Sequence, residues 1–278
     1  MKTEVQAGAA RKGRPPWRPF LGWCVHFYTA LGLVCAAGIA VAIVEGGPAA
    51  FRWAFVLMLV ATFIDATDGT LARAVRIKEA VPNFDGRRLD DIIDFLTYTA
   101  LPLLLVWRAR LLPDGQEAWL LLPLLASAYG FCQVKAKTDD GYFLGFPSYW
   151  NLVALYLYLL HFYVFPPPGL PGWLSVGLVA GFALLTFVPS RYLYSSQKGR
   201  LNMLTNVFGV GWAGLLVSVL SRVPVDGSEA DEATRWLIVF SLLFPLYYLG
   251  VSWAVTVRLW HRRRRDRRPR TRGGSLTA

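Results

Sequence analysis

Long apolar runs alternate with short polar segments along the whole chain. A helix needs about 20 mostly apolar residues to cross the hydrocarbon core of a bilayer, and eight stretches approach that length. They lie at residues 21–44, 50–66, 90–107, 117–134, 149–166, 173–190, 203–221 and 235–257. The polar sequence between them is too short for a separate soluble domain. The pattern predicts an all-α, polytopic integral membrane helical bundle of about eight transmembrane helices.

Composition supports a membrane protein. The 278 residues are 55% hydrophobic and only 17% charged, and the mean hydropathy is +0.39, so the chain is more apolar than an ordinary soluble domain. No small-residue cleavage pattern follows the first apolar run, which is therefore expected to remain as a span and not to act as a signal peptide. The cysteines Cys24, Cys35 and Cys132 fall in apolar runs, and we expect them to be packing residues, neither disulfide-bonded nor zinc-bound.

Basic residues indicate the orientation. A net charge of +11 would suggest nucleic-acid binding in a soluble protein, yet Lys and Arg here gather in alternate connections. With both termini in the cytoplasm, most of the 29 basic residues lie on the inner side, as the positive-inside rule requires. We therefore expect cytoplasmic termini and no nucleic-acid partner. Residues 20–257 would form the membrane domain, between a basic interfacial segment at 1–19 and a disordered basic tail at 258–278 that contacts membrane lipids.

Aspartates interrupt the apolar sequence where the second run ends and the third begins. Asp65 and Asp68 are three residues apart, and Asp90 and Asp94 are four apart, so each pair shares one face of a helix, whereas Asp91 points elsewhere. Buried carboxylates repel one another unless a cation neutralises them. An all-oxygen ligand set favours Mg²⁺ or Mn²⁺ over zinc, and two ions about 3.5–4 Å apart would suit four aspartates and a pyrophosphate.

Small residues and arginines surround the aspartates. Gly69 and Ala72 would allow a ligand to approach the helix closely, and the guanidinium of Arg73 can hold phosphate oxygens bidentately. The set predicts a pyrophosphate site made of Asp65, Asp68, Gly69, Ala72, Arg73 and Gly86. The structural alternatives are a packing glycine at 69, a turn glycine at 86, and ion pairs of the aspartates with Arg73, Arg76, Arg87 and Arg88.

These residues form the pattern D-x2-D-G-x2-A-R-x12-G-x3-D-x3-D between Asp65 and Asp94. The pattern closely resembles the signature of the CDP-alcohol phosphatidyltransferase family. The resemblance implies that the first three motif aspartates bind divalent metal, that Asp94 also holds metal and serves as the general base, and that the Gly, Ala and Arg residues contact the CDP moiety. Where many relatives have Asn before a Thr, this chain has His26 before Thr29, so a nucleotide role for His26 stays open.

A finer resemblance concerns the acceptor. Most members of the family have eight or nine residues between the Arg and the second Gly, and a core of six spans. The twelve-residue gap of this chain, its eight runs and the segments VHFYTALG and VPNFDGRRLDDIIDFLTY are similar to the bacterial members that condense CDP-diacylglycerol with choline. This resemblance implies those two substrates, a bacterial inner-membrane location with the active site facing the cytoplasm, and a homodimer.

Choline carries a quaternary ammonium group that cannot donate a hydrogen bond, so its site is expected to use aromatic faces or a carboxylate. Tyr98 lies one turn beyond Asp94 on nearly the same face, and is the first candidate. The others are Asp85, Tyr142, Tyr149, Trp150, Tyr192 and Tyr194. Interfacial aromatic belts and a pairing of Asp85 with Arg87 are the alternatives. Arg191, Lys198 and Arg200 either hold lipid phosphate or form a solvated inner loop.

Other functions are consistent with parts of the pattern. The acceptor could be serine or inositol in the same chemistry. A cation transporter is an alternative of another class, because intramembrane aspartates often mark ion pathways. The aspartates lie at the inner edge of the membrane with no acidic residue deep in the other spans, which disfavours a transport path. A catalytically inactive relative is disfavoured because all four motif aspartates are present.

Overall fold

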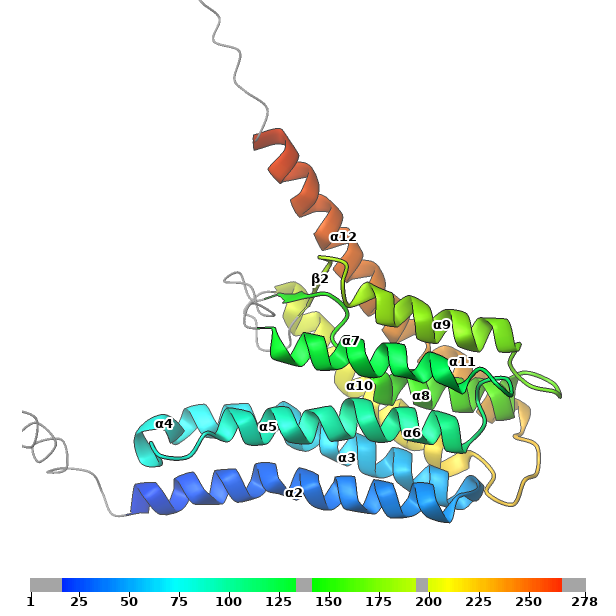
Figure 1. Cartoon of the computed structure of the whole chain (residues 1–278), viewed down its shortest axis with the longest axis horizontal. Coiled ribbons are helices and arrows are strands. Elements are labelled where there is room, and N and C mark those ends of the chain that lie inside the picture. Colours follow the sequence, from blue (N-terminus) through cyan, green and yellow to red (C-terminus); the bar gives the residue numbers. More distant parts are fainter. Residues whose placement is uncertain (1–16, 134–141, 194–199, 267–278) are drawn as a thin grey trace, which may run out of the picture.

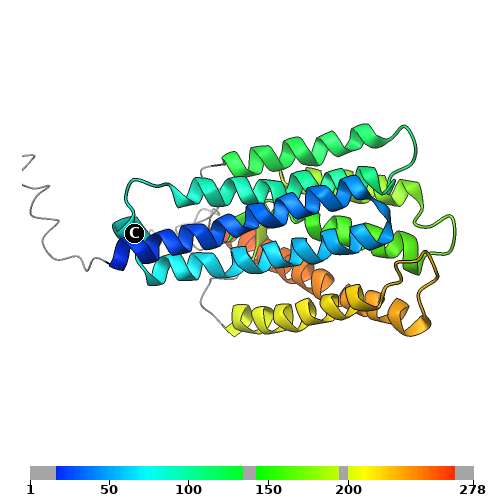
Figure 2. The same ribbon diagram turned by 90° about the horizontal axis from the view of Figure 1, so that it is seen from below.

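The computed structural model describes residues 17–133, 142–193 and 200–266. In these ranges the chain is almost entirely helical, and its long helices lie side by side with loops at both ends of the bundle (Figures 1 and 2). Four helical segments are long and apolar enough to cross a membrane: Trp17–Glu45, Gly47–Ala74, Asn202–Arg222 and Glu232–His261. Shorter apolar helices accompany them at Glu117–Cys132, Trp150–Val164 and Gly172–Leu185. The chain is a polytopic membrane protein, as the hydrophobic pattern predicts.

The first half of the chain forms three helical rods. Helix α2 (Trp17–Glu45) turns at Gly46, whose positive φ of 72° favours glycine, into α3 (Gly47–Ala74). A short helix α4 (Ile77–Ala80) leads to α5 (Gly86–Asp94). Helix α5 runs without interruption through a π-helical segment, η1 (Phe95–Ala100), into α6 (Leu101–Arg108). The third rod therefore contains the second aspartate pair and, directly after it, an irregular turn of a kind that often occurs at functional sites.

The second half adds further helices and a small two-stranded sheet whose strands are far apart in the sequence. Its helical elements are η2 (Glu117–Leu120), α7 (Leu121–Cys132), α8 (Trp150–Leu159), η3 (Leu160–Val164), α9 (Gly172–Leu185), α10 (Arg200–Arg222), α11 (Glu232–Ser241) and α12 (Leu243–Asp266). Strands β1 (Phe143–Leu144) and β2 (Arg191–Tyr192) pair antiparallel, with Phe143 opposite Tyr192. Figure 1 shows β2 beside α12, and the far end of α12 leaving the bundle.

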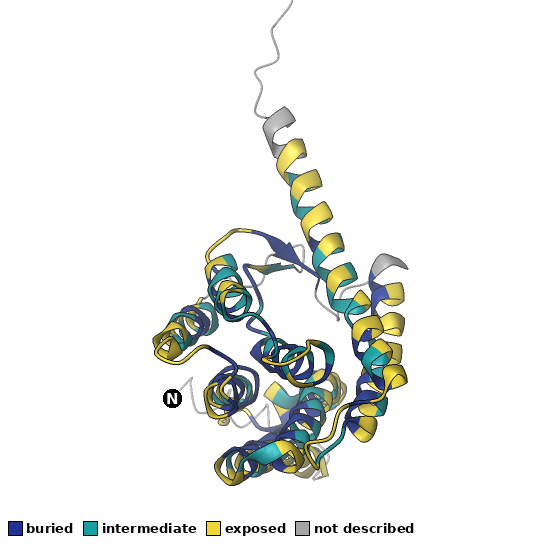
Figure 3. Ribbon diagram, turned by 90° about the vertical axis from the view of Figure 1, so that its right-hand side faces the viewer, coloured by how far each residue is buried: buried dark blue, intermediate teal, exposed yellow. Residues whose placement is uncertain are grey.

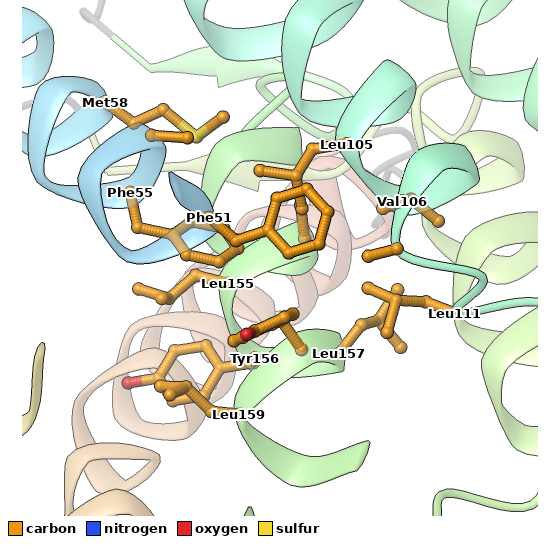
Figure 4. Close-up of a cluster of buried hydrophobic side chains, with 14 of the residues drawn as sticks. Phe51, Phe55, Met58, Leu105, Val106, Leu111, Leu155, Tyr156, Leu157 and Leu159 are labelled. Carbon is orange, nitrogen blue, oxygen red and sulfur yellow. The ribbon is translucent and has the colours of Figure 1, made fainter. Parts of the chain in front are cut away.

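Burial follows the bundle geometry. The largest buried cluster joins α3, α6 and α8, and Figure 4 shows Phe55, Leu105 and Leu155 meeting there, none more than 2% exposed. The outward sides of the helices are exposed (Figure 3). On α2 the exposed residues Phe20, Phe27, Val34 and Val41, seven apart, are apolar, and each is about two-thirds exposed. Seven residues are close to two helical turns, so these side chains form one stripe. Such a stripe suits contact with lipid chains and not with water.

Each predicted run falls mainly on helix, and the differences lie at the ends of the runs and in the interior of the eighth. Helix α3 continues to Ala74, well past the predicted end at residue 66, so the whole segment from Asp65 to Arg73 is helical. Helix α12 continues to Asp266, so the first nine residues of the tail that the sequence predicts to be disordered are helical. The rest of that tail, most of segment 1–19, Lys135, Lys137, Tyr194 and Lys198 lie outside the described residues.

The eighth run is broken between α11 and α12 for a local reason. Pro245 has no backbone N–H to donate to the carbonyl of Ser241, as a regular helix would require. The hydroxyl of Tyr156 donates to that carbonyl oxygen instead, at 2.9 Å.

At the start of α11, hydrogen bonds from Thr234 to the capping carboxylate lower the pKa of Asp231.

The cysteines differ in part from the prediction. All three are free, as expected, but only Cys35 is buried. Cys24 and Cys132 are exposed on the outside of the bundle. Packing within the protein therefore accounts for Cys35 alone.

Candidate functional site

Three aspartates converge from two helices. Asp65 and Asp68 lie one turn apart on α3, and Asp90 lies on α5. One carboxylate oxygen of each lies within 4.8 Å of the others. Asp68 is 6% exposed, and Asp65 and Asp90 are half-buried. The spacing of the two motif pairs predicts this convergence, and the structure provides it.

Two of these carboxylates are held by hydroxyl groups from other helices. The Oγ1 of Thr29, on α2, donates to Oδ2 of Asp68 at 2.7 Å in a buried hydrogen bond. The hydroxyl of Tyr98, in η1, donates to Oδ2 of Asp65 at 2.8 Å. Hydrogen bonds of this kind orient metal-ligating carboxylates. The site is therefore assembled by α2, α3, α5 and η1 together.

Asp94 lies next to the cluster without being part of the group of three. It is one turn beyond Asp90, at the end of α5, and is half-buried. Its carboxylate is close enough to Asp65, Asp90 and Asp68 to be repelled by their charges. Asp91 is exposed, as its place on the helix predicts. Asp94 thus lies beside the cluster, at the end of α5.

The residues fit a divalent cation. Three carboxylates this close together and partly or fully buried repel one another strongly, and a cation removes that repulsion. The donor set is all oxygen, which suits Mg²⁺ or Mn²⁺. Arg73 donates to Oγ1 of Thr70 at 2.9 Å and is close enough to Asp68 for their charges to attract, while Arg88 pairs with Asp85 at 3.2 Å. We conclude that the Asp65, Asp68 and Asp90 cluster could bind metal.

Gly86 faces a histidine ring. A Cβ atom at Gly86 would lie 2.5 Å from Cε1 of His26, closer than real side-chain contacts allow. His26 is 5% exposed, and its ring packs 4.4 Å from Phe84 and 5.8 Å from Trp23, measured between ring centroids. Its Nε2 has no hydrogen-bond partner. The structure thus offers a reason for glycine at this position besides the predicted contact with pyrophosphate, because α5 needs room for His26 of α2.

Replacing Gly86 with alanine is expected to destabilise the protein by about 1–3 kcal/mol, because the added methyl group overpacks the His26 ring. Thermal unfolding in detergent measures this loss. In the His26→Ala variant, adding Gly86→Ala should cost little further stability if room for the ring is what matters. If this double variant is as stable as His26→Ala alone but turns over more slowly, Gly86 is also required next to the nucleotide.

Four aromatic candidates for the acceptor site belong to one connected group. The ring centroids of Tyr98 and Tyr149 are 6.3 Å apart. Phe146 lies 6.4 Å from Tyr149, 5.6 Å from Trp150 and 6.3 Å from Tyr192. Trp150 and Tyr192 are almost completely buried, and the indole N–H of Trp150 donates to Oγ of Ser127 at 2.8 Å. These two therefore serve first as packing residues behind Tyr149.

Asp85 and Tyr142 occupy other places. Asp85 caps α5. Its carboxylate accepts a hydrogen bond from the backbone N–H of Arg88 and forms an ion pair with the guanidinium of that same arginine. Its partner is thus Arg88, and not Arg87 as the sequence suggested. Tyr142 receives the guanidinium of Arg191, 5.7 Å from its ring centroid. Neither residue is among the ring contacts that link Tyr98 to Tyr149.

Sequence reasoning misses two residues at the site. Thr29 stands out in the sequence only for its spacing from His26, although its hydroxyl holds Asp68. Tyr248 of α12 does not stand out at all, although its ring lies 6.2 Å from Tyr149 and 6.3 Å from Tyr192. No local pattern marks either residue. Their roles depend on contacts between helices far apart in the chain.

Comparisons with known proteins agree with the site. The sequence profile described as CDP-alcohol phosphatidyltransferase matches residues 26–188, more than half of the chain. The chain belongs to the CDP-alcohol phosphatidyltransferase family. Its relatives include the phosphatidylcholine synthases of Pseudomonas aeruginosa (32% identity over 243 residues, 86% of this chain and 90% of the relative) and Borreliella burgdorferi (31% over 231 residues, 82% and 94%).

A third relative, the phosphatidylcholine synthase of Bradyrhizobium diazoefficiens, is 37% identical over 212 residues, which cover 75% of this chain and 74% of the relative. The family assignment rests on the same residues that the motif identified, since the matched stretch contains α3, α5 and all four motif aspartates. The chain is therefore a transferase of this family, and the cation transporter is set aside.

Proposed function

We propose that the protein is a phosphatidylcholine synthase, which transfers the phosphatidyl group of CDP-diacylglycerol to choline and releases CMP. The observation that carries the proposal is the cluster of Asp65, Asp68 and Asp90, with Asp94 one turn farther along α5. Relatives that match most of this chain are named phosphatidylcholine synthases. Serine or inositol as acceptor is the alternative within the same chemistry.

The four motif aspartates would hold Mg²⁺ or Mn²⁺, and we propose two ions. When bound, the metal would neutralise the pyrophosphate of the substrate and the departing CMP. Thr29 and Tyr98 fix the orientation of Asp68 and Asp65 before substrate arrives. The CDP moiety would lie along α3, against Gly69 and Ala72, with the Arg73 guanidinium on phosphate oxygens and Gly86 at the start of α5.

Asp94 is proposed as the general base. Its carboxylate accepts the proton of the choline hydroxyl, and the choline oxygen then attacks the phosphorus that carries diacylglycerol. A new phosphorus–oxygen bond forms as the bond from that phosphorus to the bridging oxygen of CMP breaks, and CMP leaves with the bonding electrons. This is a direct displacement, which requires no covalent enzyme intermediate.

Tyr98 and Tyr149 are the proposed contacts for the quaternary ammonium of choline. Tyr98 connects them to the reaction centre, because its hydroxyl is bonded to Asp65 while its ring neighbours Tyr149. Trp150 and Tyr192 pack against Phe146, which in turn contacts Tyr149. Asp85 remains a candidate only if substrate binding releases it from Arg88.

For the membrane arrangement, we propose eight spans with both termini in the cytoplasm of a bacterial inner membrane, so that the aspartates face the cytoplasm. Arg18, Arg73, Arg76, Arg87 and Arg88 occupy the end of the bundle where α2 begins, α3 ends and α5 begins (Figure 1). That concentration of positive charge supports an inner location. The membrane domain at 20–257 with basic flanking segments, and a homodimer, also remain proposals.

Expression in a bacterium whose membrane contains no phosphatidylcholine tests the function. Cells fed labelled choline should accumulate labelled phosphatidylcholine when they express the wild-type chain, and should form it about 10²–10⁴-fold more slowly when they express Asp94→Asn at the same protein level. Formation of labelled phosphatidylcholine by the Asp94→Asn cells at the wild-type rate would contradict the assigned base. Its absence from wild-type cells that take up choline would contradict the function.

A further inference from the structure

Helix α12 lies outside the stretch that the family as a whole shares. The family match ends at residue 188, before α10 begins. The alignment with the phosphatidylcholine synthase of Pseudomonas aeruginosa covers 243 residues and therefore continues well beyond that point. Helices α10, α11 and α12 lie outside the family match, where features that differ between members of the family are expected.

One face of α12 is hydrogen-bonded to the segment at β2. Tyr248, Ser252 and Thr256 are four residues apart and share that face. The Tyr248 hydroxyl donates to the carbonyl of Leu193 at 2.9 Å, and Oγ of Ser252 accepts from the N–H of Leu193 at 3.5 Å. Oγ1 of Thr256 accepts from the N–H of Arg191 at 2.7 Å. These bonds fix the position of the Tyr248 ring.

The fixed ring continues the aromatic group that begins at the aspartates. Tyr248 lies 6.2 Å from Tyr149 with the ring planes at 61°, and Tyr149 lies 6.3 Å from Tyr98 with the planes at 48°. Tyr98 is bonded to Asp65. Rings this close and this steeply tilted can present their faces to one cation, which binds within about 6 Å of a ring centroid. Tyr149 and Tyr248 are both only half-buried, unlike the packing residues Trp150 and Tyr192, and Tyr98 between them and the aspartates is 8% exposed.

We propose that Tyr248 is a specificity-determining residue for the acceptor, whose ring face receives the quaternary ammonium of choline together with Tyr149 and Tyr98. This proposal rests on the proposed function, because it takes choline as the acceptor. A trimethylammonium group needs no hydrogen-bond partner and is attracted by ring faces. Serine and inositol would leave their polar groups unpaired against the same rings, so the cluster discriminates against them.

Steady-state kinetics of the full-length protein test the assignment. Tyr248→Leu should raise the KM for choline about tenfold, as loss of one cation–π contact would, and leave the KM for CDP-diacylglycerol within about twofold. Tyr248→Phe keeps the ring face and loses only the hydroxyl bond to Leu193, so its KM for choline should rise less than that of Tyr248→Leu. Tyr247→Leu is the matched control, because Tyr247 contacts Phe208, Phe244 and Thr205 instead.

Charge discrimination provides a readout that packing would not change. The wild-type protein should bind choline far more tightly than 3,3-dimethylbutan-1-ol, which has the same shape without the charge. Tyr248→Leu should reduce the ratio of these two affinities about tenfold. If Tyr248→Leu does not fold, phenylalanine and trifluorophenylalanine at position 248 keep the shape, and the KM for choline should rise with fluorination. An unchanged KM across that pair, or equal effects of Tyr248→Leu and Tyr247→Leu, would overturn the proposal. A wild-type protein that forms no phosphatidylcholine would overturn the proposed function itself.

Discussion

Replacing Asp94 with asparagine is expected to lower kcat for phosphatidylcholine formation by about 10²–10⁴-fold, the usual contribution of a general base. The substitution keeps the size of the side chain but removes its ability to accept the choline proton. Metal binding should persist, because Asp65, Asp68 and Asp90 already form a group without Asp94. Turnover at saturating substrates, together with Mn²⁺ binding followed by electron paramagnetic resonance, measures the two effects separately.

Asp91→Asn is the control for the Asp94 variant. Asp91 is on the same helix but exposed on another face, so its loss should change kcat by less than about threefold, as is usual for surface substitutions. Full choline incorporation by Asp94→Asn would show that another group accepts the proton. A loss of Mn²⁺ binding equal to that of an Asp68 variant would instead make Asp94 a metal ligand first and a base second.

Asp68→Asn is expected to abolish activity by preventing metal binding. Asp68 is the most buried of the three clustered aspartates, and its loss removes both a charge and a ligand oxygen. The affinity for Mn²⁺ should fall by more than the 10–100-fold that loss of a residue supporting a ligand typically costs, about 100-fold or more. Titration of Mn²⁺ into the detergent-solubilised protein measures this affinity without relying on turnover.

Thr29→Val provides a graded comparison with Asp68→Asn. Valine keeps the shape of threonine but cannot donate the 2.7 Å hydrogen bond to Asp68. The Mn²⁺ affinity should fall by about 10–100-fold, and raised Mn²⁺ should restore activity to Thr29→Val but not to Asp68→Asn. Wild-type Mn²⁺ affinity in Asp68→Asn would remove the basis for placing metal at this cluster.

The sequence alone is sufficient to predict the features that follow from a local repeat of residues. Apolar runs predict the helices because a span must satisfy its own backbone in lipid, and the three- and four-residue spacings of the aspartates predict their shared faces. The convergence of Asp65, Asp68 and Asp90 follows from the adjacency of the second and third spans. The motif also places Asp94 beside them. These properties depend on spacings within a helix and on the packing of two consecutive helices.

Contacts between distant segments could not be predicted in this way. Thr29 and Asp68 are 39 residues apart, and nothing local indicates which hydroxyl will hold the carboxylate. The spacing from Asp94 identifies Tyr98, but the hydrogen bond of Tyr98 to Asp65 depends on how η1 packs against α3. Tyr248 becomes part of the aromatic group only because α12 docks on β2. The tail is helical to Asp266, against the prediction, because charge alone does not end a helix.

The identity of the lipid product tests the central claim most directly. Purified protein is supplied with CDP-diacylglycerol, Mn²⁺ and, in parallel, labelled choline, serine or inositol, and both CMP and the labelled lipid are quantified. The account predicts one phosphatidylcholine for each CMP with choline, and no labelled lipid with serine or inositol. A product formed from serine or inositol and none from choline would contradict it.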